Sequence, residues 1–157
     1  MSDRGQSAGG KTAAANELTL HASCVALGDR GVLITGPSGS GKSDLALRLI
    51  DGGARLVADD LTTVRAEAGA LVALAPPRLA GRIEVRGIGI LPVPSVPHVR
   101  LALDVALAPS AEIERLPEPE HAAYLGVTLL RISLDPFTAS AAAKVRRALA
   151  DAASDPQ

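Results

Sequence analysis

The chain has 157 residues, a formal net charge of −1, and a composition that is 47% apolar but only 1% aromatic. A chain of this length can bury the core of one domain without disulfides or a structural metal. The scarcity of aromatic rings and the even spread of charge argue against a nucleic-acid-binding protein.

Residues 1–15 are polar and rich in Gly, Ala and Ser, and we interpret them as a flexible tail before one domain over 16–157. The tail lacks the apolar centre of a signal peptide, and no apolar run reaches the ~20 residues that span a bilayer. Cys24 is the only cysteine, which excludes an internal disulfide and favours a reducing compartment. We therefore expect a cytoplasmic protein without membrane association.

Short apolar runs and one Gly-rich loop organise the first half of the chain, and a Pro-rich region and an Ala-rich helix organise the second half. Strands have apolar or alternating runs bounded by Gly and Pro, whereas helices repeat their apolar residues every three or four positions. In chain order, we expect strands over 18–27 and 32–35, a helix over 43–51, strands over 55–58, 61–64 and 70–74, a β-rich stretch over 83–93, a strand over 99–107, a mobile loop over 109–120, a strand over 127–132, and a helix over 138–153. This order predicts a single α/β domain with a central mixed β-sheet flanked by helices.

The Gly-rich segment matches G-x-x-x-x-G-K-[ST], the pattern of a loop that binds triphosphates. Its residues are Gly36, Pro37, Ser38, Gly39, Ser40, Gly41, Lys42 and Ser43. Glycines allow the backbone N–H groups to point at phosphate oxygens, and the following helix adds its positive dipole end. Lys42 is expected to bridge the β- and γ-phosphates, and the Ser43 hydroxyl to bind Mg²⁺. The flanking strand and helix favour this ATP site over the alternative, a simple Gly/Ser turn.

Two acids, Asp59 and Asp60, follow the strand that comes after this helix. A strand–helix–strand unit is nearly always parallel, so both strands should end at the edge of the sheet where ligands bind. Adjacent residues of a strand point to opposite faces, so the two acids should have different tasks. One could approach the metal and the other could accept the proton of an attacking hydroxyl, as kinases require. The alternative is a solvated turn.

At this point the sequence resembles the HPr kinase/phosphorylase family, bacterial enzymes that phosphorylate a serine of the phosphocarrier protein HPr. The similarity covers roughly residues 18–133 and includes three blocks in the family's order. These blocks are His21 followed by the segment 31–43, Arg-Leu-Val-Ala-Asp-Asp over 55–60, and Ile-Glu-Val-Arg-Gly-Ile-Gly-Ile over 83–90. The third block is the most specific, because ordinary P-loop kinases lack it. The chain resembles a short form that consists of the catalytic domain alone.

The resemblance implies site residues, position by position. It implies an active-site histidine at His21, a catalytic base at Asp60, a second magnesium position at Glu84, and a catalytic arginine at Arg115. It also implies an HPr-like protein partner, a hexameric assembly, and a C-terminal helix that helps to dock HPr. Pro117 replaces the glycine of the family's Glu-Arg-Leu-Gly stretch, which weakens the assignment of Arg115.

Another departure concerns the reverse, phosphorolytic reaction. The family's basic stretch near the C-terminus, similar to Pro-Val-Arg-Pro-Gly-Arg, reads Arg-Ile-Ser-Leu-Asp-Pro-Phe over 131–137 in this chain. The glycine and the second arginine are missing, while the residues matched to the kinase reaction are present. The sequence therefore supports the kinase direction and not the reverse one.

The residue types and spacing of the third block also predict a role in phosphoryl transfer. Glu84 and Arg86 are two apart and would share one face of a strand, where a carboxylate for metal and a guanidinium for phosphate suit phosphoryl transfer. An ion pair at an exposed edge is the alternative. Nothing local fixes the pKa of His21, so a structural role is its alternative reading. We expect a buried stripe on the last helix that begins at Phe137 and packs on the sheet.

The predicted activity is the ATP-dependent phosphorylation of a serine hydroxyl on an HPr-like protein. Two alternatives stay open from the sequence. The first is a P-loop kinase of a small molecule, and the second is a nucleotide-binding sensor without catalysis. The identity of the base, Asp59 or Asp60, also stays open.

Overall fold

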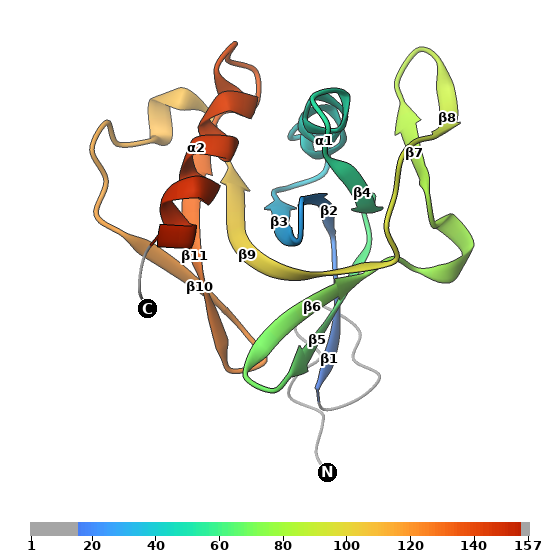
Figure 1. Ribbon diagram of the computed structural model, residues 1–157. Coiled ribbons are helices and arrows are strands. Elements are labelled where there is room, and N and C mark those ends of the chain that lie inside the picture. Colours follow the sequence, from blue (N-terminus) through green and yellow to red (C-terminus); the bar gives the residue numbers. More distant parts are fainter. Residues whose placement is uncertain (1–15, 155–157) are drawn as a thin grey trace.

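A computed structural model describes residues 16–154, so the tail expected over 1–15 lies outside the described residues. Nine of the strands form one mixed sheet, and the other two, β7 and β8, form a separate hairpin (Figure 1). The strands are β1 Glu17–Leu20, β2 Ala22–Leu27, β3 Arg30–Thr35, β4 Arg55–Ala58, β5 Thr62–Glu67, β6 Ala70–Leu74, β7 Arg82–Val85, β8 Gly89–Pro92, β9 His98–Leu107, β10 Glu120–Tyr124 and β11 Val127–Leu134. The α-helices are α1 Lys42–Asp51 and α2 Ala141–Ser154, and the short 3₁₀ turns are η2 Pro77–Leu79 and η3 Ser110–Glu112.

Strand β9 is the hub of the large sheet. It runs parallel to β3 and to β11, and its first residues pair antiparallel with β6. The sheet continues from β3 through β2 to β4, and from β6 through β5 to β1. Because β9 belongs to both parts, the sheet curls, as the sweep of β9 in Figure 1 shows.

Both β3 and β4 pair antiparallel with β2, which lies between them. They therefore run in the same direction, as the strand–helix–strand pattern predicts, although they are not neighbours. The ends of β3 and β4 and the beginning of β2 consequently meet at one edge of the sheet. This edge carries the Gly-rich loop and the two acids.

The two faces of the sheet bury different side chains, because successive residues of a strand point to opposite sides. Ile34 packs with residues of α1 and α2, whereas the preceding Leu33 packs with residues of β5 and β6. Both helices thus cover one face, and the curled β5–β6 part of the sheet covers the other (Figure 1). The predicted mixed sheet is confirmed, but the helices lie on one side of it.

The boundaries differ from the sequence prediction in several places, and four of these differences change an element. The strand expected over 18–27 breaks at His21, because β1 pairs with β5 while β2 pairs with β3 and β4. The β-rich stretch over 83–93 is a hairpin of its own. The end of the expected loop over 109–120 begins β10, which the Pro-rich sequence conceals. The last helix begins only at Ala141.

The core consists of aliphatic side chains, as the composition requires, and Cys24 is buried in it. Burial in this apolar setting raises the pKa of the Cys24 thiol far above its ordinary value. His98 and His121 lie exposed on the surface. Within residues 16–154, no helix has both the length and the apolar character needed to cross a membrane.

Candidate functional site

The Gly-rich loop lies between the end of β3 and the beginning of α1. Gly39 and Gly41 adopt φ angles of 79° and 103°, in the region that glycine tolerates and other residues avoid. A side chain at Gly41 would also collide with the segment that connects β11 to α2, because a Cβ there would lie 2.9 Å from Cγ of Pro136. The loop geometry therefore requires glycine at Gly41 for two independent reasons.

Lys42 and Ser40 line the inside of this loop. The Lys42 ammonium donates to the carbonyl oxygens of Gly36 (2.9 Å) and Pro37 (3.1 Å), and its side chain is buried. The Ser40 Oγ is a buried polar atom that has no partner among the described residues. A buried hydroxyl without a partner is uncommon in proteins and marks a place where a bound group could supply one. This loop therefore fits an anionic ligand.

Asp59 connects three elements through its carboxylate. Its Oδ1 accepts a 2.6 Å hydrogen bond from Ser43 Oγ and a 3.0 Å bond from Ser23 Oγ, and its Oδ2 accepts a long 3.4 Å bond from the Glu84 N–H. These partners come from α1, β2 and β7. The hydroxyl predicted to bind Mg²⁺ is thus in direct contact with a carboxylate.

Asp60 follows in a different backbone conformation. Its φ of 69° is unusual for a residue with a side chain, although Asp tolerates this region better than most. The chain leaves the strand here, and the exposed Asp60 lines a cavity of about 350 Å³ beside the Gly-rich loop. The adjacent acids therefore have separate environments: Asp59 is half-buried behind Ser43, and Asp60 faces the open cavity.

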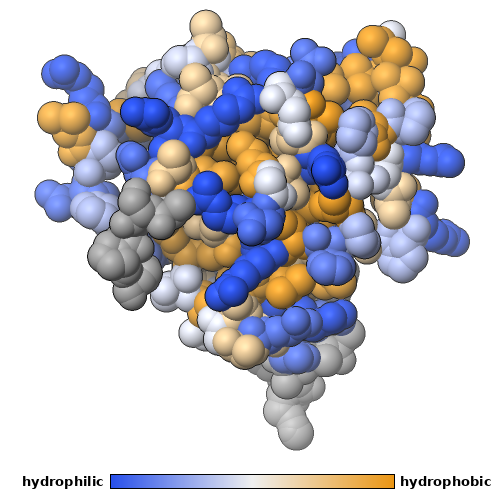
Figure 2. Space-filling view, in the orientation of Figure 1, coloured by the Kyte–Doolittle hydropathy of each residue, from blue (hydrophilic) through white to orange (hydrophobic). Residues whose placement is uncertain are grey.

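The β7–β8 hairpin forms one wall of the cavity. Glu84, Val85 and Arg86 line it, so both charged residues of the third sequence block lie at the site. Arg86 lies just beyond the end of β7, however, and does not share a strand face with Glu84 as the spacing predicted. Figure 2 shows hydrophobic surface in the area of this hairpin, at the upper right. The hairpin also exposes the side chains of Ile88 and Ile90.

Phe137 also lines the cavity, which is a correction to the sequence prediction. It precedes α2 and is 71% exposed, so it does not belong to the buried stripe of that helix. It contributes to the cavity lining beside Gly41, and its backbone N–H donates to the Asp135 carboxylate. Arg48 of α1 donates to the carbonyl oxygen of Pro136 and holds this segment against the loop.

Six of the predicted site residues are not among those that line the cavity. Gly36, Pro37, Ser40 and Asp59 belong to the Gly-rich loop or bond to it, and the other two are His21 and Arg115. His21 is exposed at the break between β1 and β2, next to Ala22, which pairs with Thr35 at the end of β3. Arg115 is exposed in the segment between η3 and β10. Catalytic roles for these two residues stay predictions.

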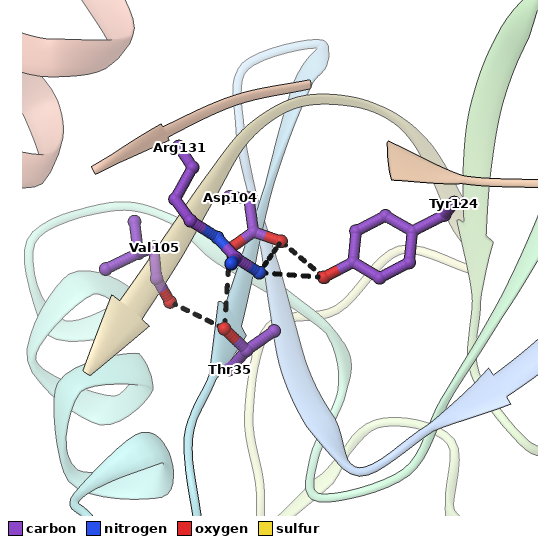
Figure 3. A network of polar contacts seen from close by, with 5 residues as sticks. All are labelled: Thr35, Asp104, Val105, Tyr124 and Arg131. Atoms are coloured by element: carbon purple, nitrogen blue, oxygen red, sulfur yellow. Dashed lines mark hydrogen bonds and ion pairs between the residues drawn. The ribbon is translucent and has the colours of Figure 1, made fainter. Parts of the chain in front are cut away.

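A polar cluster joins the end of β3 to β9, β10 and β11 (Figure 3). The buried carboxylate of Asp104 on β9 accepts from Tyr124 Oη (2.6 Å) and from Arg131 Nε (3.1 Å), and more weakly from Thr35 Oγ1 (3.4 Å). Burial, followed by the hydrogen bond to Asp104, raises the pKa of Tyr124 well above its ordinary value. Thr35 immediately precedes Gly36, so this cluster supports the base of the loop.

Sequence reasoning missed Ser23 and Asp104. An aspartate inside the apolar run 99–107 was a signal for a buried polar partner. Ser23 gave no such signal, because a serine in a strand is unremarkable until its neighbours are known.

The residues at this edge suit Mg²⁺ and a triphosphate. Hard oxygen donors are the ligands that Mg²⁺ prefers, and it is commonly bound through one or two carboxylates and the phosphates of a substrate. Ser43, Asp60 and Glu84 supply such oxygens in the cavity lining, and Asp59 bonds to Ser43. In the described part of the chain, no group of three or more His, Cys, Asp or Glu side chains could hold a metal alone. Oxygen donors of this kind fit a metal that also binds phosphates.

The fold and the cavity together define an α/β domain whose strand–loop–helix junction opens into a polar site. The family model of the HPr Serine kinase C-terminal domain matches residues 12–133. The chain belongs to this family.

Individual relatives agree with this assignment. The HPr kinase/phosphorylase of Clostridium tetani is 45% identical over 91 residues, which are 58% of this chain and 30% of that protein. The HPr kinase/phosphorylase of Geobacillus thermodenitrificans is 38% identical over 116 residues, which are 66% of this chain and 38% of that protein. The chain therefore spans well under half the length of these curated relatives.

A solved structure described as the Hpr(Ser) kinase/phosphatase from Coxiella burnetii has the same fold. It superposes with a TM-score of 0.72 at 28% sequence identity, and the match covers 85% of this chain and 98% of that chain. The agreement supports the curled sheet with both helices on one face.

Proposed function

We propose that this protein is an ATP-dependent kinase that phosphorylates a serine hydroxyl of an HPr-like phosphocarrier protein. One observation carries the proposal. The lysine and serine of the Gly-rich loop share a cavity with Asp60 and Glu84, and Asp59 lies directly behind Ser43. Groups that could bind phosphate, bind a metal and accept a proton thus lie at one edge of the sheet, and this supports phosphoryl transfer.

In this proposal, Lys42 and the backbone amides of 36–43 hold the triphosphate, and Ser43, Asp59 and Glu84 hold magnesium. Magnesium, when bound, would neutralise charge on the phosphates. Asp60 accepts the proton of the attacking serine, because it faces the cavity while the Asp59 carboxylate is engaged by two hydroxyl groups. Arg86 contacts the transferring phosphoryl group from the hairpin wall.

The remaining parts of the proposal rest on the family. The names of the relatives supply HPr as the substrate. The family resemblance supplies a homo-oligomer, a hexamer, and the single cysteine favours the cytoplasm. Roles for His21 and Arg115 would require that ligand binding or a second subunit complete the site around them. The proposal covers the kinase direction only, because segment 131–137 lacks the glycine and the second arginine of the family's basic stretch.

The direct test is incubation of the protein with HPr, ATP and magnesium, followed by mass measurement of HPr. We expect a gain of one phosphoryl group on a serine, and none when Lys42→Met replaces the wild type. Turnover of a metabolite without turnover of HPr would favour a small-molecule kinase. ATP binding without any transfer would favour a sensor.

A further inference from the structure

Ser23 belongs to none of the sequence motifs, but it lies between the two acids of the site and forms a hydrogen bond with each of them. It is the second residue of β2, its side chain is completely buried, and its hydroxyl contacts both acids of the site. Ser23 Oγ donates to Asp59 Oδ1 at 3.0 Å and accepts from the Asp60 N–H at 3.0 Å. A serine hydroxyl has one proton to donate, so this proton is committed to Asp59 while a lone pair holds Asp60.

The two hydrogen bonds of Ser23 fix different parts of the two acids, the side chain of Asp59 and the backbone of Asp60. The bond to Asp59 holds that carboxylate against Ser43, on the side of α1. The bond from Asp60 holds the backbone at the point where φ reaches 69° and the chain leaves the strand. A non-glycine residue persists in such a conformation only when its surroundings fix it. Without this turn, the carboxylate of Asp60 would point in another direction.

We propose that Ser23 is a positioning residue that assigns separate tasks to the two acids. It fixes Asp59 beside the metal-binding hydroxyl and leaves Asp60 free to face the cavity as the base. This inference rests on the proposed kinase function, because it explains how the two neighbouring carboxylates of that mechanism are kept apart. It also answers which of them is the base, since Asp60 is bound to Ser23 through its backbone alone.

The nearby hydroxyl of Thr62 provides a control for the loss of a buried hydroxyl that has only a structural role. Thr62 is also completely buried, and its Oγ1 donates to the carbonyl oxygen of Ala22 at 2.7 Å and not to either acid. Removing this hydroxyl with Thr62→Val deletes a buried hydrogen bond next to Ser23 without touching the site. Ser23→Ala deletes the two bonds to the acids. The pair separates loss of packing from loss of positioning.

The experiment measures three quantities in the wild type, Ser23→Ala and Thr62→Val. They are kcat and KM for HPr phosphorylation, the Kd for ATP with magnesium and with EDTA, and the hydrogen-exchange rate of the Asp60 amide. For Ser23→Ala we expect kcat to fall by roughly 10- to 100-fold, the range found for outer-shell partners of metal ligands. The KM for HPr and the metal-free Kd for ATP should change by less than about threefold. The magnesium-dependent gain in ATP affinity should shrink and the Asp60 amide should exchange faster. Thr62→Val should leave all of these near wild-type values.

The outcomes are separable. Wild-type kcat and an unchanged Asp60 exchange rate in Ser23→Ala would overturn the inference. An equal loss of kcat in Thr62→Val would overturn it as well, because any buried hydroxyl would then suffice. If the wild type does not phosphorylate HPr, the proposed function fails. The magnesium dependence of ATP binding and the exchange of the Asp60 amide would still decide the role of Ser23.

Discussion

Replacing Gly41 tests how closely the segment between β11 and α2 packs against the Gly-rich loop. In Gly41→Ala, the new Cβ would lie 2.9 Å from Cγ of Pro136 and 3.1 Å from Cζ of Phe137, at a φ of 103°. Adopting positive φ costs a residue with a side chain about 1–2 kcal/mol. The buried Pro136 ring cannot turn away, and overpacking of this kind adds about 1–3 kcal/mol. We therefore expect Gly41→Ala to lower the free energy of unfolding by about 2–5 kcal/mol in total.

Gly69→Ala is the matched control. Gly69 lies in the β5–β6 turn with a φ of 80°, and a Cβ there would meet nothing within 4 Å. Gly69→Ala should lose only the stability that positive φ costs, so the free energies of unfolding of the two variants should differ by about 1–3 kcal/mol. For a domain of this size, that difference corresponds to a further fall in Tm of roughly 2–12 °C.

Thermal unfolding and ATP titration measure both consequences. In Gly41→Ala the amides at the beginning of α1 must move, so we expect the ATP affinity to fall by more than about tenfold, whereas Gly69→Ala should bind ATP like the wild type. If both variants lose the same stability and both bind ATP normally, the close packing of Pro136 on the loop is not a constraint, and the reasoning is wrong.

Three further predictions concern single side chains. Asp60→Asn, which keeps the backbone bond to Ser23 and tolerates the same φ, should lower kcat for HPr phosphorylation by roughly 10²- to 10⁴-fold with little change in ATP affinity, and an unchanged kcat would exclude it as the base. Tyr124→Phe removes a 2.6 Å bond to the buried Asp104 carboxylate and should cost about 1.5–3 kcal/mol in urea unfolding, and a loss below the error of that assay would contradict the cluster. The bonds from the Ser110 hydroxyl and from backbone N–H groups lower the pKa of Asp135, so its contribution to stability is complete above its unfolded pKa of about 3.9 and is lost as the pH falls through the lower folded value. Asp135→Asn should therefore flatten this part of the acid unfolding profile, and an unaltered profile would refute that assignment.

Local sequence determined the elements around the loop. The strand at 55–58 was predicted with its observed bounds, and the helix after the loop within one residue, because each depends on a short apolar pattern and on the glycines at 52 and 53 that separate the two elements. The directions of β3 and β4 also followed from the sequence, since a crossover of this length favours one handedness. The two acids could be brought to the Gly-rich loop on this basis alone.

Only the tertiary structure decided which side chains contact these acids. Ser23 lies 36 residues before Asp59, and Phe137 reaches the cavity from the connection to α2, so neither position has a local pattern that marks it. The break at His21 has the same origin: the sequence is uniformly strand-like there, and the change of neighbour from β5 to β3 ends β1. Backbone propensity acts over a few residues, whereas pairing partners and burial are set by contacts across the whole sheet. The sequence therefore determined the chemistry available at the site, and the fold decided how its two carboxylates are oriented.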